Sequence, residues 1–125
     1  YHPNEGNIEY KCLNKENIIS IKKYGEEIYK YQHFSCLQVG VFSTSLYEGL
    51  AFGLPTIILK NLKNANQTLE TLSFIKKGVY AIERPEQVIE VLNHLEKPQK
   101  KDIESLWKNN SINNIRKQLK IILKH

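Results

Sequence analysis

Cysteine is scarce in this chain of 125 residues, which contains only Cys12 and Cys36. Two cysteines so far apart make neither a metal-binding motif nor a disulfide framework, so we expect two reduced thiols. The sequence also lacks an apolar run of the roughly 18 residues that a transmembrane helix needs. Its polar first residues lack the apolar core of a secretory signal peptide. These absences predict a soluble protein of the cytoplasm.

Methionine is absent altogether, including at the first position. We therefore expect the chain to be a piece of a longer protein. Its length fits one domain that can bury a substantial core. Hydrophobic residues make up 41% of the chain and charged residues 25%, which is the composition of an ordinary globular domain.

The net charge of +5 favours an acidic partner, either nucleic acid or a small molecule that carries phosphate. The lysines are scattered, and no basic helix with interleaved aromatic residues is visible, which argues against nucleic acid. No two histidines have the spacing of metal ligands, so we expect no bound metal. A phosphate-bearing small molecule is the better expectation.

Short apolar runs alternate with amphipathic stretches, which is the pattern of a parallel α/β sheet. The expected strands are 18–21, 37–42, 56–59 and 79–82. The expected helices are 26–33, 46–52, 67–77, 86–95, 102–108 and 111–124. With right-handed crossovers, this order predicts an α/β, Rossmann-like three-layer domain with a mostly parallel sheet.

Ligands of such sheets bind outside the carboxyl ends of the strands. Three hydroxyl residues, Ser43, Thr44 and Ser45, stand there between the strand 37–42 and the helix 46–52. Free N–H groups at a helix start, together with the helix dipole, favour an anion, and the hydroxyls add hydrogen bonds to a phosphate. Capping of the helix explains one hydroxyl residue well and three in a row less well. Phosphate binding and capping both remain open.

Glu48 has two compatible interpretations. If Ser45 is the N-cap, Glu48 lies at position N3 and the pair forms a capping box. Alternatively, the Glu48 carboxylate faces the ligand crevice and accepts hydrogen bonds from two ribose hydroxyls.

In the loop after the next strand, Lys60 and Asn66 can reach a ligand, although solvation is the ordinary role of such residues.

The run EGLAFGLPTI, from Glu48 to Ile57, resembles the donor-site signature of glycosyltransferases of the GT-B fold. In that family, a helix with a ribose-binding glutamate and a small residue leads to a glycine, a proline and a strand. The hydroxyl run 43–45 resembles the serine-rich motif of bacterial sialyltransferases and of related capsule or lipooligosaccharide enzymes. The dipeptide His2-Pro3 resembles their histidine–proline motif.

The resemblance implies roles for particular residues, because both motifs hold the nucleotide monophosphate of an activated sugar in those enzymes. The implied nucleotide- and phosphate-binding residues are His2, Pro3, Ser43, Thr44, Ser45 and Glu48. The possible donor contacts are Glu5, Lys60 and Asn66.

Two departures from related families argue against the retaining subgroup of GT-B enzymes and against the epimerases. Retaining GT-B enzymes carry a second glutamate eight positions before the ribose glutamate, where this chain has Gly40. The epimerases that act on UDP-N-acetylglucosamine carry an arginine and glutamate cluster after the third strand, and Arg84 comes too late to supply it. No set of nucleophile, base and acid can be assembled from the sequence, so the catalytic residues stay unassigned.

The resemblance implies that residues 1–125 are the C-terminal, donor-binding half of a GT-B enzyme of bacterial surface polysaccharide synthesis. The substrate would be a CMP- or UDP-linked sugar, with no cofactor, and an N-terminal domain would bring the acceptor and the general base. The full-length protein would work in the cytoplasm, at the inner face of the membrane as a peripheral protein, and the isolated chain would be inactive. The alternatives are an epimerase-like domain of the UDP-N-acetylglucosamine 2-epimerase type and a non-enzymatic α/β binding module.

Overall fold

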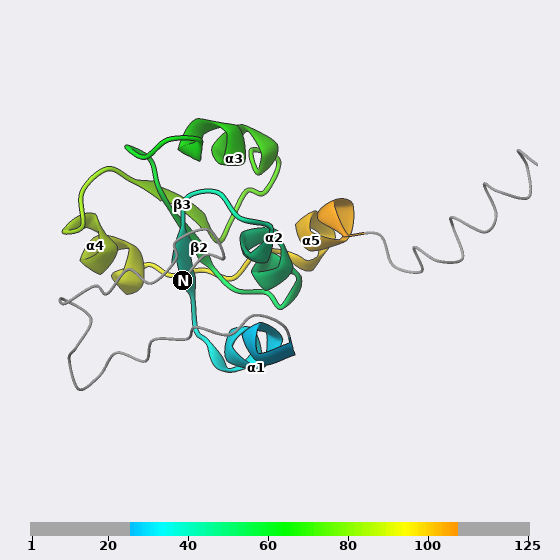
Figure 1. Cartoon of the computed structure of the whole chain (residues 1–125). Coiled ribbons are helices and arrows are strands. Elements are labelled where there is room, and N and C mark those ends of the chain that lie inside the picture. The colour runs from blue at the N-terminus through cyan, green and yellow to red at the C-terminus, as the bar shows by residue number, and fades with distance from the viewer. Residues whose placement is uncertain (1–25, 108–125) are drawn as a thin grey trace, which may run out of the picture.

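The computed structural model describes residues 26–107 of the chain. Its elements follow one another in the order α1 (Glu26–Phe34), β1 (Gln38–Gly40), α2 (Thr44–Ala51), β2 (Thr56–Leu59), α3 (Ala65–Thr71), β3 (Val79–Ile82), α4 (Gln87–Asn93) and α5 (Lys100–Leu106) (Figure 1). The expected strand 18–21, the expected helix 111–124 and the candidate residues His2, Pro3 and Glu5 lie outside the described residues. None of the described helices is long and apolar enough to cross a membrane.

The three described strands form one parallel sheet in the order β1-β2-β3. Gln38 pairs with Thr56 in the first ladder, and Thr56 pairs with Val79 in the second. Each strand is followed by a helix, as parallel pairing requires. The expected α/β class with a parallel sheet is therefore confirmed, and the layout is compatible with a Rossmann-like domain.

Figure 1 shows α2 and α5 on one side of the strands and α4 on the other. The core lies mainly on the α2 side, where α2, β2 and the α3 region contribute the side chains of two buried clusters. These clusters contain Leu46, Ile58, Ala65, Leu50, Leu72 and Ile75. Ile57, on the opposite face of β2, is also fully buried, so apolar contacts cover the central strand on both faces.

Helix α2 comes very close to β1 because Gly49 has no side chain. A Cβ atom at Gly49 would overlap the side-chain amide of Gln38. That amide joins three elements, since its Nε2 donates to the carbonyl of Leu46 at 2.7 Å and to Oγ1 of Thr56 at 2.8 Å. The glycine thus permits a polar link between α2, β1 and β2 beneath the helix.

Helices α1 and α5 both contact α2. From α1, Nε2 of Gln32 donates to the carbonyl of Ser45 at 2.8 Å, and the ring of Tyr29 lies 6.2 Å from that of Phe52. At the end of α5, the indole Nε1 of Trp107 donates to the carbonyl of Tyr47 at 2.8 Å. The helix that follows the hydroxyl run is therefore held from both sides.

Several expected boundaries are wrong. The strand expected at 37–42 is shorter, and the helix expected at 67–77 begins at Ala65 and ends at Thr71. Leu72 and Ile75 have helical spacing and are buried, but they reach the core through tight turns, in which the N–H of Ile75 donates to the carbonyl of Leu72. The helix begins early because Asn64 adopts a left-handed conformation, with φ of 70°, and turns the chain into it.

Candidate functional site

Residues at the carboxyl ends of all three strands meet at one edge of the sheet. The hydroxyl run 43–45 follows β1, Lys60 follows β2, and the dipeptide 83–84 follows β3. Because parallel strands end at the same edge, the sequence-predicted residues of two separate loops are brought to one side of the molecule. We call this set the carboxyl-edge site.

Ser43 is the N-cap of α2. Its backbone is extended, with φ of −165° and ψ of 144°, and its Oγ accepts a hydrogen bond from the N–H of Ser45 at 3.3 Å. The hydroxyls of Ser43 and Ser45 lie 2.8 Å apart and are hydrogen-bonded to each other. The two serines therefore form a fixed pair at the start of the helix.

Glu48 does not form the expected capping box. Since the cap is Ser43 and not Ser45, Glu48 lies at the fifth helical position, and the first turn of α2 contains no acidic residue. Its Oε1 instead accepts a hydrogen bond from the hydroxyl of Tyr29 at 3.3 Å. The negative charge of Glu48, and then this hydrogen bond, raise the pKa of the Tyr29 phenol. The Glu48 carboxylate is thus held by α1.

Thr44 is the exposed member of the hydroxyl run. As the first residue of α2, it has a backbone N–H without an intrahelical partner, and within the described residues its hydroxyl makes no hydrogen bond to protein. The helix dipole adds partial positive charge at this point. Thr44 therefore offers two neighbouring donors to an anion, while Ser43 and Ser45 fix the backbone that presents them.

Lys60 and Asn66 are placed differently from each other. Nζ of Lys60 lies 2.9 Å from Oε1 of Glu83, and both side chains are about half exposed. The hydrogen bond from Lys60, and then its charge, hold the pKa of Glu83 below the ordinary value. Asn66 is exposed within α3. The Lys60 ammonium has three N–H donors, so it can hold Glu83 and also donate to a ligand phosphate, whereas no described contact restrains Asn66.

Sequence reasoning missed a hollow of about 180 Å³ at the same edge, beside β2 and β3. Its lining is largely apolar, with Asn61, Glu83 and Arg84 as polar members. Nδ2 of Asn61 donates to the carbonyl of Glu83 at 3.0 Å, which holds the two loops together. The sequence could have placed Arg84 at this edge, because the residue stands two positions beyond a well-defined strand.

The described residues contain no group of three or more side chains that could hold a metal ion. Comparisons with protein-family models, with curated proteins and with solved structures found no match to this chain. The function must therefore be argued from the carboxyl-edge site and from the motifs themselves.

Proposed function

We propose that this chain is the donor-binding domain of a GT-B glycosyltransferase of bacterial surface polysaccharide synthesis, and that it binds a CMP- or UDP-linked sugar. The observation that carries the proposal is the Ser43–Ser45 pair at the start of α2, beyond the carboxyl end of β1 in a parallel sheet. Helix starts in this position bind phosphate in many α/β proteins. The glutamate-to-proline run that resembles the GT-B signature begins in the same helix.

Thr44 carries the main contact in this proposal. Its N–H and hydroxyl donate to the phosphate that links sugar and nucleoside. Negative charge builds up on this phosphate as the sugar leaves, so donors that are fixed in advance stabilise the transition state more than the ground state. Lys60 adds positive charge beside the phosphate and donates to it through an N–H that Glu83 does not use.

In this proposal, the Glu48 carboxylate binds the ribose hydroxyls. The hydroxyl of Tyr29 contacts Oε1, so Oε2 remains for the ribose, and Oε1 can accept a second hydrogen bond. Tyr29 then acts as a positioning residue that fixes the carboxylate. In this proposal, the acceptor and the general base come from an N-terminal domain.

The test is a thermal-shift and titration series with CMP, UDP, CDP and GDP. We expect one nucleotide to stabilise the chain and Thr44→Val to weaken its binding about tenfold, the loss of roughly 1.5 kcal/mol for one hydrogen bond to a charged group. Thr71→Val is the matched control, because Thr71 is also an exposed helical threonine, and its hydroxyl contacts only the carbonyl of Gln67.

Two results would refute the proposal: no nucleotide in the series binds, or Thr44→Val and Thr71→Val bind the nucleotide equally well. If a nucleotide binds, the full-length protein is then assayed with the matching nucleotide sugar. Transfer to an acceptor supports the glycosyltransferase, whereas epimerisation of the sugar supports the epimerase-like alternative.

A further inference from the structure

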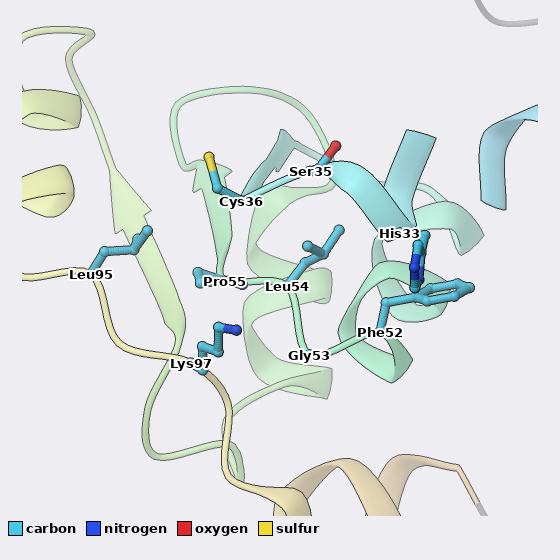
Figure 2. A pocket seen from close by; sticks show the side chains of 9 residues that line it. All are labelled: His33, Ser35, Cys36, Phe52, Gly53, Leu54, Pro55, Leu95 and Lys97. Atoms are coloured by element: carbon cyan, nitrogen blue, oxygen red, sulfur yellow. The ribbon is translucent and has the colours of Figure 1, made fainter. Parts of the chain in front are cut away.

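A cavity larger than the hollow beside β2 and β3 lies at the opposite edge of the sheet from the proposed nucleotide site. Its volume is about 400 Å³, within the usual range for small-molecule sites. Three segments converge on it: residues 33–36 before β1, residues 52–55 before β2, and residues 95–97 after α4 (Figure 2). We call it the amino-edge cavity, because two of these segments precede the amino ends of strands.

The floor of this cavity is fixed by the backbone. Leu54 and Pro55 are buried, the N–H of Leu54 donates to the carbonyl of Gly49 at 3.1 Å, and the carbonyl of Pro55 accepts from the N–H of Gln38 at 2.9 Å. Gly53, with φ of 74°, makes the tight turn that leads from α2 into this floor. A ligand would therefore meet a surface that is formed before it arrives, which lowers the entropic cost of binding.

The walls of the cavity offer an aromatic face. Phe52 is 45% exposed, and the ring of His33 packs edge-on against it at 6.5 Å. Figure 2 shows these two rings on one side of the cavity and Leu95 on the other, with Leu54 and Pro55 between them. A flat ring fits this arrangement, because it can stack on Phe52 and cover the apolar floor.

The charge of the lining has one sign. Of residues 26–107, those that line the cavity include Lys97 and no carboxylate. The neighbouring acid, Glu96, binds Lys77 at 2.6 Å. Lys97 has no ion-pair partner within residues 26–107, and it lines the same cavity as Pro55 and Leu54 (Figure 2). A positive group above an apolar floor favours an anion with an apolar body.

We propose that the amino-edge cavity binds a small aromatic carboxylate, with the ring against Phe52 and the carboxylate at Lys97. This site is separate from the carboxyl-edge site and does not depend on the proposed nucleotide binding. It gives the domain a second ligand.

Cys36 makes the site testable, because it is an exposed free thiol on the cavity lining. The test uses the full chain with Cys12→Ser, which leaves one thiol. The probe is dithiobis(nitrobenzoate), an aromatic carboxylate disulfide. The Cys36 thiolate attacks one sulfur of the probe, the S–S bond of the probe breaks as a protein–probe S–S bond forms, and one coloured thionitrobenzoate leaves. The thiol proton goes to the solvent.

We expect the reaction rate to saturate with probe concentration, and Lys97→Gln to slow the reaction at low probe concentration about fivefold, as for a lost ion pair near the surface. Neutral dithiodipyridine should react equally fast with both proteins. Lys101→Gln is the matched control: it removes the same charge from an exposed lysine that does not line the cavity. We also expect naphthalene carboxylate, but not the corresponding neutral amide, to protect Cys36.

The proposal is overturned if Lys97→Gln and Lys101→Gln slow the anionic probe equally, because the effect is then general electrostatic attraction. It is also overturned if Lys97→Gln slows the neutral probe as much as the anionic one, or if naphthalene carboxylate gives no protection. Failure of nucleotide binding leaves each of these measurements unchanged, so the two proposals fail separately.

Discussion

Gly49→Ala tests the close approach of α2 to β1. A Cβ atom at this position would lie 2.5 Å from Cδ of Gln38. The Gln38 amide cannot move aside without losing its hydrogen bonds to Leu46 and Thr56. Overpacking of this kind costs about 1–3 kcal/mol, and the better helix propensity of alanine offsets about 1 kcal/mol of that cost. We expect a net loss of about 0–2 kcal/mol in the free energy of unfolding.

The effect of Gly49→Ala on the free energy of unfolding should change sign in a second background. In Gln38→Ala, the side chain that opposes the new methyl group is gone, so only the helix propensity remains. Gly49→Ala should then stabilise the protein by about 0.5–1 kcal/mol. Gln38→Ala itself lowers stability, because it removes two part-buried hydrogen bonds of about 1 kcal/mol each. The four proteins form a double-mutant cycle with a large coupling energy.

The assay is urea unfolding followed by far-ultraviolet circular dichroism, with the m-value as a check that the transition stays two-state. Gly53→Ala is the control: its φ is 74°, and nothing lies within 4 Å of an added Cβ. It should cost about 1 kcal/mol through backbone strain alone, and equally in both backgrounds. If Gly49→Ala destabilises both backgrounds to the same extent, contact with Gln38 is not what requires the glycine.

Further substitutions check the remaining contacts. Ser43→Ala removes the N-cap of α2 and should lower the free energy of unfolding by about 1 kcal/mol, whereas Thr44→Val should leave it within about 0.5 kcal/mol, both measured by urea unfolding. Leu50→Ala truncates a side chain with no exposed surface and should cost about 2–5 kcal/mol in the same measurement, with exposed Leu92→Ala as the control. Lys60→Gln removes the hydrogen bond and charge that lower the pKa of Glu83, so NMR titration should show that pKa rising towards its ordinary value. Because the folded-state pKa of Glu83 is depressed, the stability gained from this pair is present above the ordinary glutamate pKa. It disappears as the pH falls through the folded-state value. An unchanged Glu83 titration in Lys60→Gln would contradict the role of Lys60 in lowering this pKa.

The strands 56–59 and 79–82 could be predicted to the residue. Each is a near-continuous apolar or β-branched run with clear limits, Pro55 and Lys60 for the first, Gly78 and Glu83 for the second. The helix expected at 67–77 is too long by six residues at its C-terminal end, because buried apolar residues continue beyond Thr71 with helical spacing. Apolar spacing records which residues are buried, but turns can bury residues with the same spacing as a helix.

The position of the hydroxyl run between β1 and α2 could be predicted from the sequence, but the contacts of its members could not. Three adjacent hydroxyl residues are equally able to cap a helix, and only the extended backbone of Ser43 shows which one does so. The Lys60–Glu83 pair depends on the register that places Leu59 opposite Ile82, so that the residues that follow the two strands become neighbours. Such a register is a tertiary property, and no local pattern between residues 60 and 83 encodes it.

Trp107 gives the carboxyl-edge site an optical reporter. It is the single tryptophan of the chain, and its indole N–H binds the carbonyl of Tyr47, one turn from the start of α2. Indole emission depends on hydrogen bonding and on exposure to water, so a shift of α2 relative to α5 changes the colour of this fluorescence. Movement of the helix that begins at Thr44 can therefore be followed without a label, in the unmodified protein.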